Sequence, residues 1–249
     1  MQCGLLGRKL GHSYSPAIHA ALGDYGYVLY EKEPDELADF LQRGDFTGLN
    51  VTIPYKKAVV PYCAALSDTA QLLGSVNTLL RRPDGTLYGD NTDYDGFESL
   101  VRQSGVEAAG KKALVLGSGG ASVTAQAVLR ALGAAVVVIS RSGEDNYENL
   151  SRHADAAIVV NTTPVGMTGG AEANDLAFEE DAIAQAEIVF DVVAIPAETP
   201  LIVSGRAQGK RVITGLEVIA IQALEQFVLY TGVRPTPEQF KAAVAFARS

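Results

Sequence analysis

The chain has 249 residues, a formal net charge of -9 at pH 7, and 47% hydrophobic and 20% charged residues. This length allows one large domain or two modest domains, each with a core of its own. The acidic balance argues against a nucleic-acid binder, whose surface would be basic, and the composition is that of an ordinary globular protein.

Strand-like and helix-like segments alternate up to residue 53, which favours a parallel sheet for the first three strands, and residues 87–89 are expected to return as a hairpin partner of 75–80. An apolar run closed by glycine at residues 3–7 predicts the first strand. Further strands are expected at 27–32, 50–53, 75–80 and 87–89, and helices from Pro16 onward and at 34–43, 59–66, 68–73 and 97–104.

Polar side chains stand where the third predicted strand ends. Asn50, Thr52 and Lys56 lie at or just past this end, because Pro54 has no N–H for a sheet ladder. Open α/β sheets bind ligands beyond the carboxyl ends of their strands. This stretch is therefore a candidate site, and an acid of the polar loop at 89–96 is a candidate to face Lys56.

Two serines occupy the first predicted strand-to-helix turn. Ser15 can cap a helix whose first position is Pro16. Ser13 is left for another role, since two hydroxyls at such a turn suit a ligand rich in hydroxyl or carboxylate oxygens. We expect His12 and His19 to be structural, because neither has a carboxylate at helical spacing.

The second half begins with a strand at 112–116, a glycine-rich turn at 117–122, a helix at 123–132 and a strand at 136–140. Glycines between a strand and a helix let a pyrophosphate sit on the helix N-terminus, so this unit predicts dinucleotide binding. Further strands are expected at 157–161, 188–193 and 211–213, and helices at 179–185, 216–230 and 235–247.

The second strand of this unit ends in Ser140, Arg141 and Ser142. A guanidinium and a hydroxyl in that corner favour NADP, because an NAD enzyme usually has an acid there for the ribose hydroxyls. Glu144 and Asp145 follow closely and weaken a phosphate site, so the preference over NAD is moderate.

Seven stretches match one family in order: SYS at 13–15, NVTIPYK at 50–56, VNT at 76–78, NTD at 91–93, GSGGAS at 117–122, NTTPVGM at 161–167 and GLEVIAIQ at 215–222. Together they resemble the shikimate dehydrogenase family over essentially the whole chain. The resemblance implies reversible reduction of 3-dehydroshikimate to shikimate by NADPH. It also implies an α/β substrate-binding and catalytic domain at 1–96, a Rossmann dinucleotide-binding domain at 97–214, and C-terminal helices at 215–249 that return to the first domain.

The same similarity assigns roles to residues. Lys56 and Asp93 would form the acid-base pair at the substrate carbinol, with Lys56 exchanging the proton. Substrate ligands would be Ser13 and Ser15 for the carboxylate, and Asn50, Thr52, Asn77, Asp93 and Gln222 around the hydroxyls. Cofactor contacts would come from Asp68, Gly117, Ser118, Gly119, Gly120, Ala121, Ser140, Arg141, Ser142, Thr162, Val192 and Gly215. Arg141 would hold the ribose phosphate, and Asp68, Val192 and Gly215 would lie at the nicotinamide end.

The chain departs from the family pattern at Ala194, where the family usually has a tyrosine that contacts substrate, and at 216–218. Two other hypotheses therefore stand beside shikimate dehydrogenase. One is a dehydrogenase of quinate or another hydroxylated ring carboxylate, although the presence of Ser15 and Thr52 favours shikimate. The other is a non-catalytic ligand-binding paralogue, which the presence of both Lys56 and Asp93 disfavours.

Cysteine usage and hydropathy indicate where the protein works. Two cysteines are too few for a disulfide framework, and no Cys/His cluster has metal-ligand spacing, so no metal is expected. Neither a signal peptide nor a membrane span is apparent. We therefore expect a cytoplasmic protein with a small-molecule substrate and no nucleic-acid or membrane partner, as a monomer or homodimer.

Overall fold

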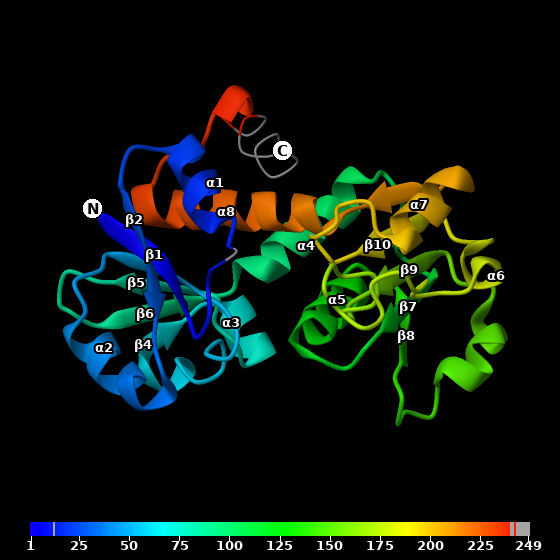
Figure 1. Cartoon of the computed structure of the whole chain (residues 1–249), viewed down its shortest axis with the longest axis horizontal. Coiled ribbons are helices and arrows are strands. Elements are labelled where there is room, and N and C mark those ends of the chain that lie inside the picture. The colour runs from blue at the N-terminus through cyan, green and yellow to red at the C-terminus, as the bar shows by residue number, and fades with distance from the viewer. Residues whose placement is uncertain (12, 240–241, 243–249) are drawn as a thin grey trace. The chain divides into compact units, whose positions relative to one another are not determined.

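The computed structural model describes residues 1–11, 13–239 and 242. The chain divides into two compact units, coloured along the chain in Figure 1. The first unit comprises Met1–Asp95 and Ala220–Ser249, and the second comprises Gly96–Ile219. The domain ends expected from the sequence were 96 and 214. Each unit has its own sheet, which confirms the predicted α/β class.

The first unit contains a six-stranded mixed sheet in the order β2-β1-β3-β5-β6-β4. Strands β2 and β3 run parallel to β1, whereas β5 pairs antiparallel with both β3 and β6. The bounds of these strands are β1 Gln2–Gly7, β2 Gly26–Glu31, β3 Gly48–Val51, β4 Cys63–Leu66, β5 Thr78–Arg81 and β6 Leu87–Asp90.

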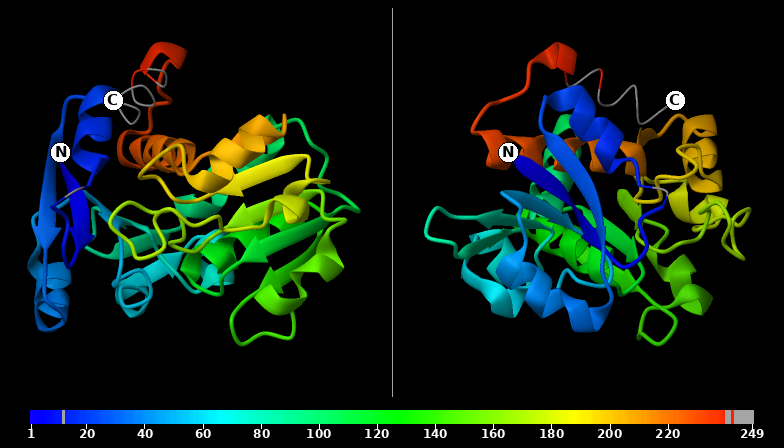
Figure 2. Two further views of the ribbon diagram at one scale, coloured as in Figure 1. Left: turned by 45° about the vertical axis from the view of Figure 1, so that its right-hand side comes forward. Right: turned by 60° about the vertical axis from the view of Figure 1, so that its left-hand side comes forward.

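Alternate residues of β3 face opposite sides of this sheet, as the period of a strand requires. Leu49 and Val51 join a buried cluster with Leu37 and Leu41 of helix α2 (Leu37–Arg43). Asn50 faces the other side, where helix α1 (Ser15–Leu22) and helix α8 (Gly215–Thr231) contribute its hydrogen-bond partners. Figures 1 and 2 show α1 and the C-terminal part of α8 on one side of the sheet and α2 on the other.

The second unit contains a five-stranded parallel sheet in the order β11-β10-β9-β7-β8. Its strands are almost continuously apolar, which fits a parallel sheet that is covered on both faces. The elements of this unit are β7 Lys112–Leu116, α5 Gly120–Ala131, β8 Ala135–Ile139, η3 Tyr147–His153, β9 Ile158–Asn161, α6 Glu180–Ile183, β10 Ile188–Asp191, α7 Pro200–Ala207 and β11 Arg211–Ile213.

One helix expected from the sequence is wrong. Residues 59–66 form a short 3-10 helix, η2 (Val60–Tyr62), followed by strand β4, which pairs with β6. A short apolar run does not distinguish helix from strand by its periodicity. The free N–H and C=O groups along β6 decide the outcome, because β4 can satisfy them only as a strand.

Two other helices begin earlier than expected, α5 at Gly120 and α4 (Thr92–Gln103) at Thr92. The 3-10 helix η1 (Pro34–Glu36) precedes α2, and α3 (Asp68–Leu73) ends at Gly74 in the left-handed conformation that glycine favours. Most of the helix expected at 235–247 falls outside the described residues. Within the described part of the chain, no helix is long and apolar enough to cross a membrane.

Candidate functional site

Lys56 and Asp93 meet in the first unit. The Lys56 ammonium lies 2.5 Å from Asp93 Oδ2, and the two side chains are 31% and 21% exposed. Lys56 follows the end of β3, and the backbone N–H of Tyr55 donates to the Thr52 carbonyl in the turn between them. A cation with a carboxylate partner and partial access to solvent is placed to give a proton to a ligand and take it back.

Asp93 lies in the first turn of α4 rather than in a loop. Asn77 explains this position, because its Oδ1 accepts both the backbone N–H and the hydroxyl of Thr92, at 2.8 and 3.2 Å. This contact caps the helix, whose positive N-terminal end also favours a carboxylate. Asn77 is 2% exposed. The described contacts therefore make Asn77 a support for the helix that carries Asp93.

Four of the candidate substrate ligands are half-buried in the first unit: Ser13, Ser15, Thr52 and Gln222. The expected Ser15 cap is wrong: Tyr14 occupies the cap position, and no side chain of the described residues caps α1. Instead, Ser13 Oγ accepts the backbone N–H of Ser15 at 3.2 Å. This hydrogen bond ties the two serines together at the start of α1.

Asn50 differs from the other candidate substrate ligands. It is 5% exposed, and its amide makes hydrogen bonds to Gln226 and Tyr230 of α8. The hydrogen bonds of its amide are therefore made inside the first unit.

The glycine turn of the second unit fits a pyrophosphate. Helix α5 begins directly after Gly119, and no side chain caps its first N–H groups. A Cβ built on Gly119 or Gly120 would meet no atom of the described residues within 4 Å, so these residues leave the space beside them open. Gly117 has φ +108, a conformation that glycine accepts easily. Unpaired N–H groups at the positive end of a helix bind phosphate oxygens.

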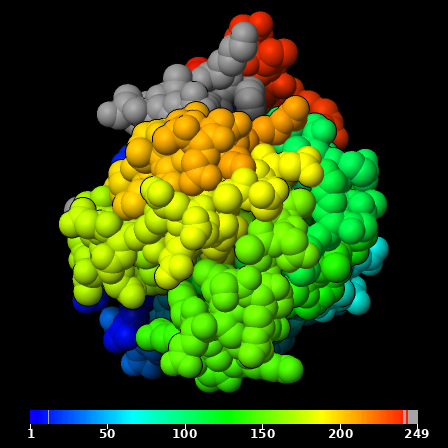
Figure 3. Space-filling view, turned by 90° about the vertical axis from the view of Figure 1, so that its right-hand side faces the viewer, coloured from blue at the N-terminus to red at the C-terminus, as the bar shows by residue number. Residues whose placement is uncertain are grey.

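A cavity of about 630 Å³ adjoins this turn. Six of the predicted cofactor residues line it: Gly117, Ser118, Gly119, Ser140, Arg141 and Thr162. Thr162 also donates its hydroxyl to the Leu116 carbonyl at 2.6 Å, which ties β9 to the start of the turn. Figure 3 shows residues 140–155 in green and residues 162–179 in yellow-green, and both segments contribute residues that line the cavity.

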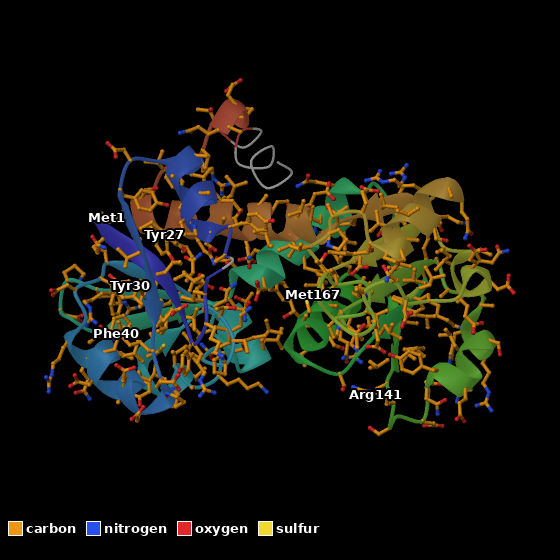
Figure 4. All side chains as sticks on the ribbon, in the orientation of Figure 1. Met1, Tyr27, Tyr30, Phe40, Arg141 and Met167 are labelled. Carbon is orange, nitrogen blue, oxygen red and sulfur yellow. The ribbon has the colours of Figure 1, made fainter. Side chains whose placement is uncertain are left out.

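Arg141, labelled in Figure 4, follows β8 and is exposed. Asp145, one of the acids expected to weaken a phosphate site in this corner, has a partner. Its Oδ1 lies 2.8 Å from Nε2 of His153. The backbone N–H of Ser140 donates to the Asp145 carbonyl, which closes the turn around Arg141. This corner therefore offers one exposed guanidinium with no acid bound to it in the described contacts.

The other predicted cofactor residues are not among those that line this cavity. Gly120 and Ala121 are exposed in the first turn of α5, and Ser142 is exposed after Arg141. Val192 and Gly215 lie together, because a Cβ on Gly215 would fall 2.4 Å from the Val192 carbonyl oxygen. Asp68 belongs to the first unit, where it is exposed at the start of α3, and it is not among the residues that line the cavity of the second unit.

Sequence patterns missed a buried carboxylate in the second unit. Asp191, at the end of β10, is fully buried and accepts from Asn161 Nδ2 (3.0 Å), the Val193 N–H (2.9 Å) and the Thr199 hydroxyl (2.7 Å). Thr199 caps α7 through the Ile202 N–H. An acid at the end of an apolar strand beside Val192 was the available signal.

Burial raises the pKa of Asp191 to about 6, against the hydrogen bonds that lower it. An aspartate in an unfolded chain has a pKa of about 3.9. Between these values the folded state holds a proton that the unfolded chain has released, so the free energy of unfolding falls as pH rises, by roughly 3 kcal/mol for the full shift.

Replacing Asp191 with asparagine should remove this fall, since the amide keeps an oxygen for Asn161 and Val193. Denaturant unfolding of Asp191→Asn and wild type should be measured from about pH 4 to pH 7. Over this range the free energy of unfolding of the variant should rise relative to that of wild type by up to roughly 3 kcal/mol. The exposed Asp181→Asn is the matched control. Parallel pH curves for Asp191→Asn and wild type would contradict the role of burial.

Comparisons with known proteins point to one family. The sequence profile described as "Shikimate dehydrogenase substrate binding domain" matches residues 5–79. A shikimate dehydrogenase (NADP(+)) of Oleidesulfovibrio alaskensis is 37% identical over 98% of this chain and 94% of its own. A shikimate dehydrogenase-like protein of Haemophilus influenzae is 37% identical over 81% and 78%. The shikimate 5-dehydrogenase of Thermus thermophilus in complex with NADP(H) and shikimate is 30% identical, covers 99% of each chain and superposes with a TM-score of 0.84.

Proposed function

Because this chain belongs to the shikimate dehydrogenase family, we propose that it catalyses the reversible NADPH-dependent reduction of 3-dehydroshikimate to shikimate. The observation that carries this proposal is the 2.5 Å contact between Lys56 and Asp93 just past the end of β3. An oxidoreductase acting on a CH–OH group needs a group that exchanges one proton with the substrate oxygen, and Lys56 is that group.

The proton path follows from the charges of this pair. NADPH, when bound, supplies the hydride that adds to the carbonyl carbon. Lys56 Nζ donates a proton to the carbonyl oxygen, and the neutral amine regains a proton from water. In the reverse direction the amine takes the hydroxyl proton. Asp93 accepts a hydrogen bond from Nζ, which holds Nζ in place, and its negative charge stabilises the ammonium form.

Substrate recognition is assigned to half-buried polar residues of the first unit. Ser13 and Ser15, at the start of α1, bind the ring carboxylate, and Thr52 and Gln222 bind ring hydroxyls. Asn77 acts mainly by holding α4, so that Asp93 stays beside Lys56. Hydroxyl and amide groups suit such a ligand because each can donate or accept.

Cofactor binding is assigned to the second unit. The open N-terminus of α5, with Gly119, Gly120 and Ala121, holds the pyrophosphate, and Arg141 between Ser140 and Ser142 holds the ribose phosphate. These residues favour NADP over NAD. Val192 and Gly215 are assigned to the nicotinamide end, as is Asp68 of the first unit.

A second candidate function is oxidation of quinate or another hydroxylated ring carboxylate. Ala194 motivates it, since a half-buried alanine offers no hydroxyl where the family usually has tyrosine. One relative carries the name "Shikimate dehydrogenase-like protein", which leaves its substrate unnamed.

One assay separates the candidates. Purified protein is mixed with shikimate or quinate and with NADP or NAD in turn, and nicotinamide absorbance is followed. Highest kcat/KM with shikimate and NADP supports the proposal, and a higher value with quinate supports the second candidate. If no pair is turned over but shikimate binds measurably, the protein is a non-catalytic ligand-binding paralogue.

We place the protein in a reducing cytoplasm, as a monomer or homodimer. Cys3 and Cys63 are both free thiols, as that compartment requires. Light scattering of the purified protein distinguishes the two assembly states.

A further inference from the structure

A buried polar cluster in the first unit takes no part in the proton exchange. We call it the β3 cluster and define it as His19 of α1, Asn50 of β3, and Gln226 and Tyr230 of α8. Their exposed fractions are 1%, 5%, 2% and 8%. Burying polar groups is costly unless each finds a partner, so this cluster calls for an explanation.

Asn50 is the centre of the β3 cluster. Its Nδ2 donates to Gln226 Oε1 at 2.5 Å, and its Oδ1 accepts from the Tyr230 hydroxyl. Nδ2 also lies 3.2 Å from His19 Nε2. An amide nitrogen can only donate, so Nε2 accepts, and the proton of a neutral ring is on Nδ1, 2.5 Å from Tyr25 Oη.

The ring of His19 stays neutral at physiological pH, because burial lowers its pKa to about 4. It stacks on Tyr27, labelled in Figure 4, with ring centroids 4.3 Å apart. Asn50 therefore ties three elements together through uncharged hydrogen bonds and has no donor left for a ligand.

The β3 cluster sets the register of α8 on β3. Gly48, Asn50 and Thr52 point to one side of the strand and its extension. A Cβ on Gly48 would lie 2.4 Å from the Tyr230 ring, and Asn50 reaches both Tyr230 and Gln226. Moving two residues along β3 thus corresponds to moving one turn back along α8. Extended by one more step, this register would bring Thr52 opposite Gln222.

Like α8, helix α1 runs antiparallel to β3. It connects two parallel neighbours, β1 and β2, so it runs antiparallel to them and to β3. Ser15, one turn before His19, is displaced from the β3 cluster toward the carboxyl end of β3. Ser15, Thr52 and Gln222 are thus each one step from a cluster member, all toward the same end of the sheet.

We propose that the β3 cluster is the positioning device of the substrate site, and that Asn50 acts through it rather than as a substrate ligand. Locking α1 and α8 to β3 holds Ser15 and Gln222 at fixed distances from Thr52. This inference rests on the proposed function, because it assigns these three residues to one ring carboxylate.

Two conservative variants test the proposal, Tyr230→Phe and Gln226→Leu, since each removes a hydrogen bond at nearly constant volume. We expect the KM for shikimate to rise about tenfold, because a displacement of about 1 Å in a positioned group has effects of this order or larger. The KM for NADP should change less than about twofold, because the cofactor cavity belongs to the second unit. An unchanged shikimate KM in both variants would overturn the proposal.

A double-mutant cycle separates positioning from general weakening. If Gln226 acts through Gln222, then adding Gln226→Leu to Gln222→Ala should raise the shikimate KM less than about twofold further. Effects that simply multiply would refute this route. The control is Leu41→Ala in the cluster on the opposite face of the sheet. It should lower stability and leave the shikimate KM unchanged, and an equal rise in KM would overturn the proposal.

Amide hydrogen exchange gives a readout that does not depend on the substrate. Both variants should exchange faster than wild type over residues 220–231, because α8 loses its tie to β3. Unchanged exchange there overturns the inference even if the protein is active on shikimate. A wild-type chain inactive on shikimate overturns the proposed function, while faster exchange in the variants would still support the tie.

Discussion

Replacing Lys56 with alanine should lower kcat for shikimate oxidation by about 10² or more and change the KM for shikimate little. The reason is that in the proposed mechanism the proton moves only as the transition state forms, whereas the hydroxyl and amide residues of the first unit bind the ground state. Steady-state kinetics with saturating NADP measure both constants.

The neighbouring Lys57 provides a matched control, because it is exposed and follows Lys56 directly. Lys57→Ala should behave as wild type. Near-normal turnover of Lys56→Ala would remove Lys56 from the chemistry. A rise in KM with kcat unchanged would make Lys56 a binding residue only.

Replacing Arg141 with alanine should raise the KM for NADP by roughly 10- to 100-fold, because a charge-assisted hydrogen bond to phosphate contributes about 1.5–3 kcal/mol. The KM for NAD should change much less, since NAD has no phosphate on this ribose. Parallel titrations with both cofactors give the ratio directly.

Arg152 is a suitable control for the general effect of positive charge, because it is exposed on η3 and does not line the cofactor cavity. Arg152→Ala should raise both KM values by a similar small factor. If Arg141→Ala affects NADP and NAD equally, the ribose phosphate is held by other groups.

Much of the fold could be predicted where the signal is local. The ends of α3 illustrate this: Ser67 accepts the Ala70 N–H, and Gly74 adopts the left-handed conformation that ends the helix. The glycine turn before α5 is equally local, because its residues act through their own backbone. Family resemblance supplied the pairing of Lys56 with Asp93, which no local pattern predicts.

Prediction failed where a distant partner decides the outcome. Strand β4 was expected to be helical, because its pairing with the edge of β6 is not visible in the local sequence. Asp93 was expected in a loop, because the cap of α4 comes from Asn77, 15 positions before Thr92. The resemblance suggested that Asn50 binds substrate, whereas the described hydrogen bonds give its amide to residues 176 and 180 positions away.

The sequence by itself determined the α/β class, most strands, the glycine turn and the chemical groups available for binding and proton exchange. Periodicity, turn residues and helix ends depend on neighbours within a few positions, so a linear sequence displays them. Only the tertiary structure decided which polar groups stay accessible to a ligand and which are used up inside the protein. A hydrogen bond satisfies a buried amide whatever the sequence distance of its partner, and that distance is what a pattern cannot show.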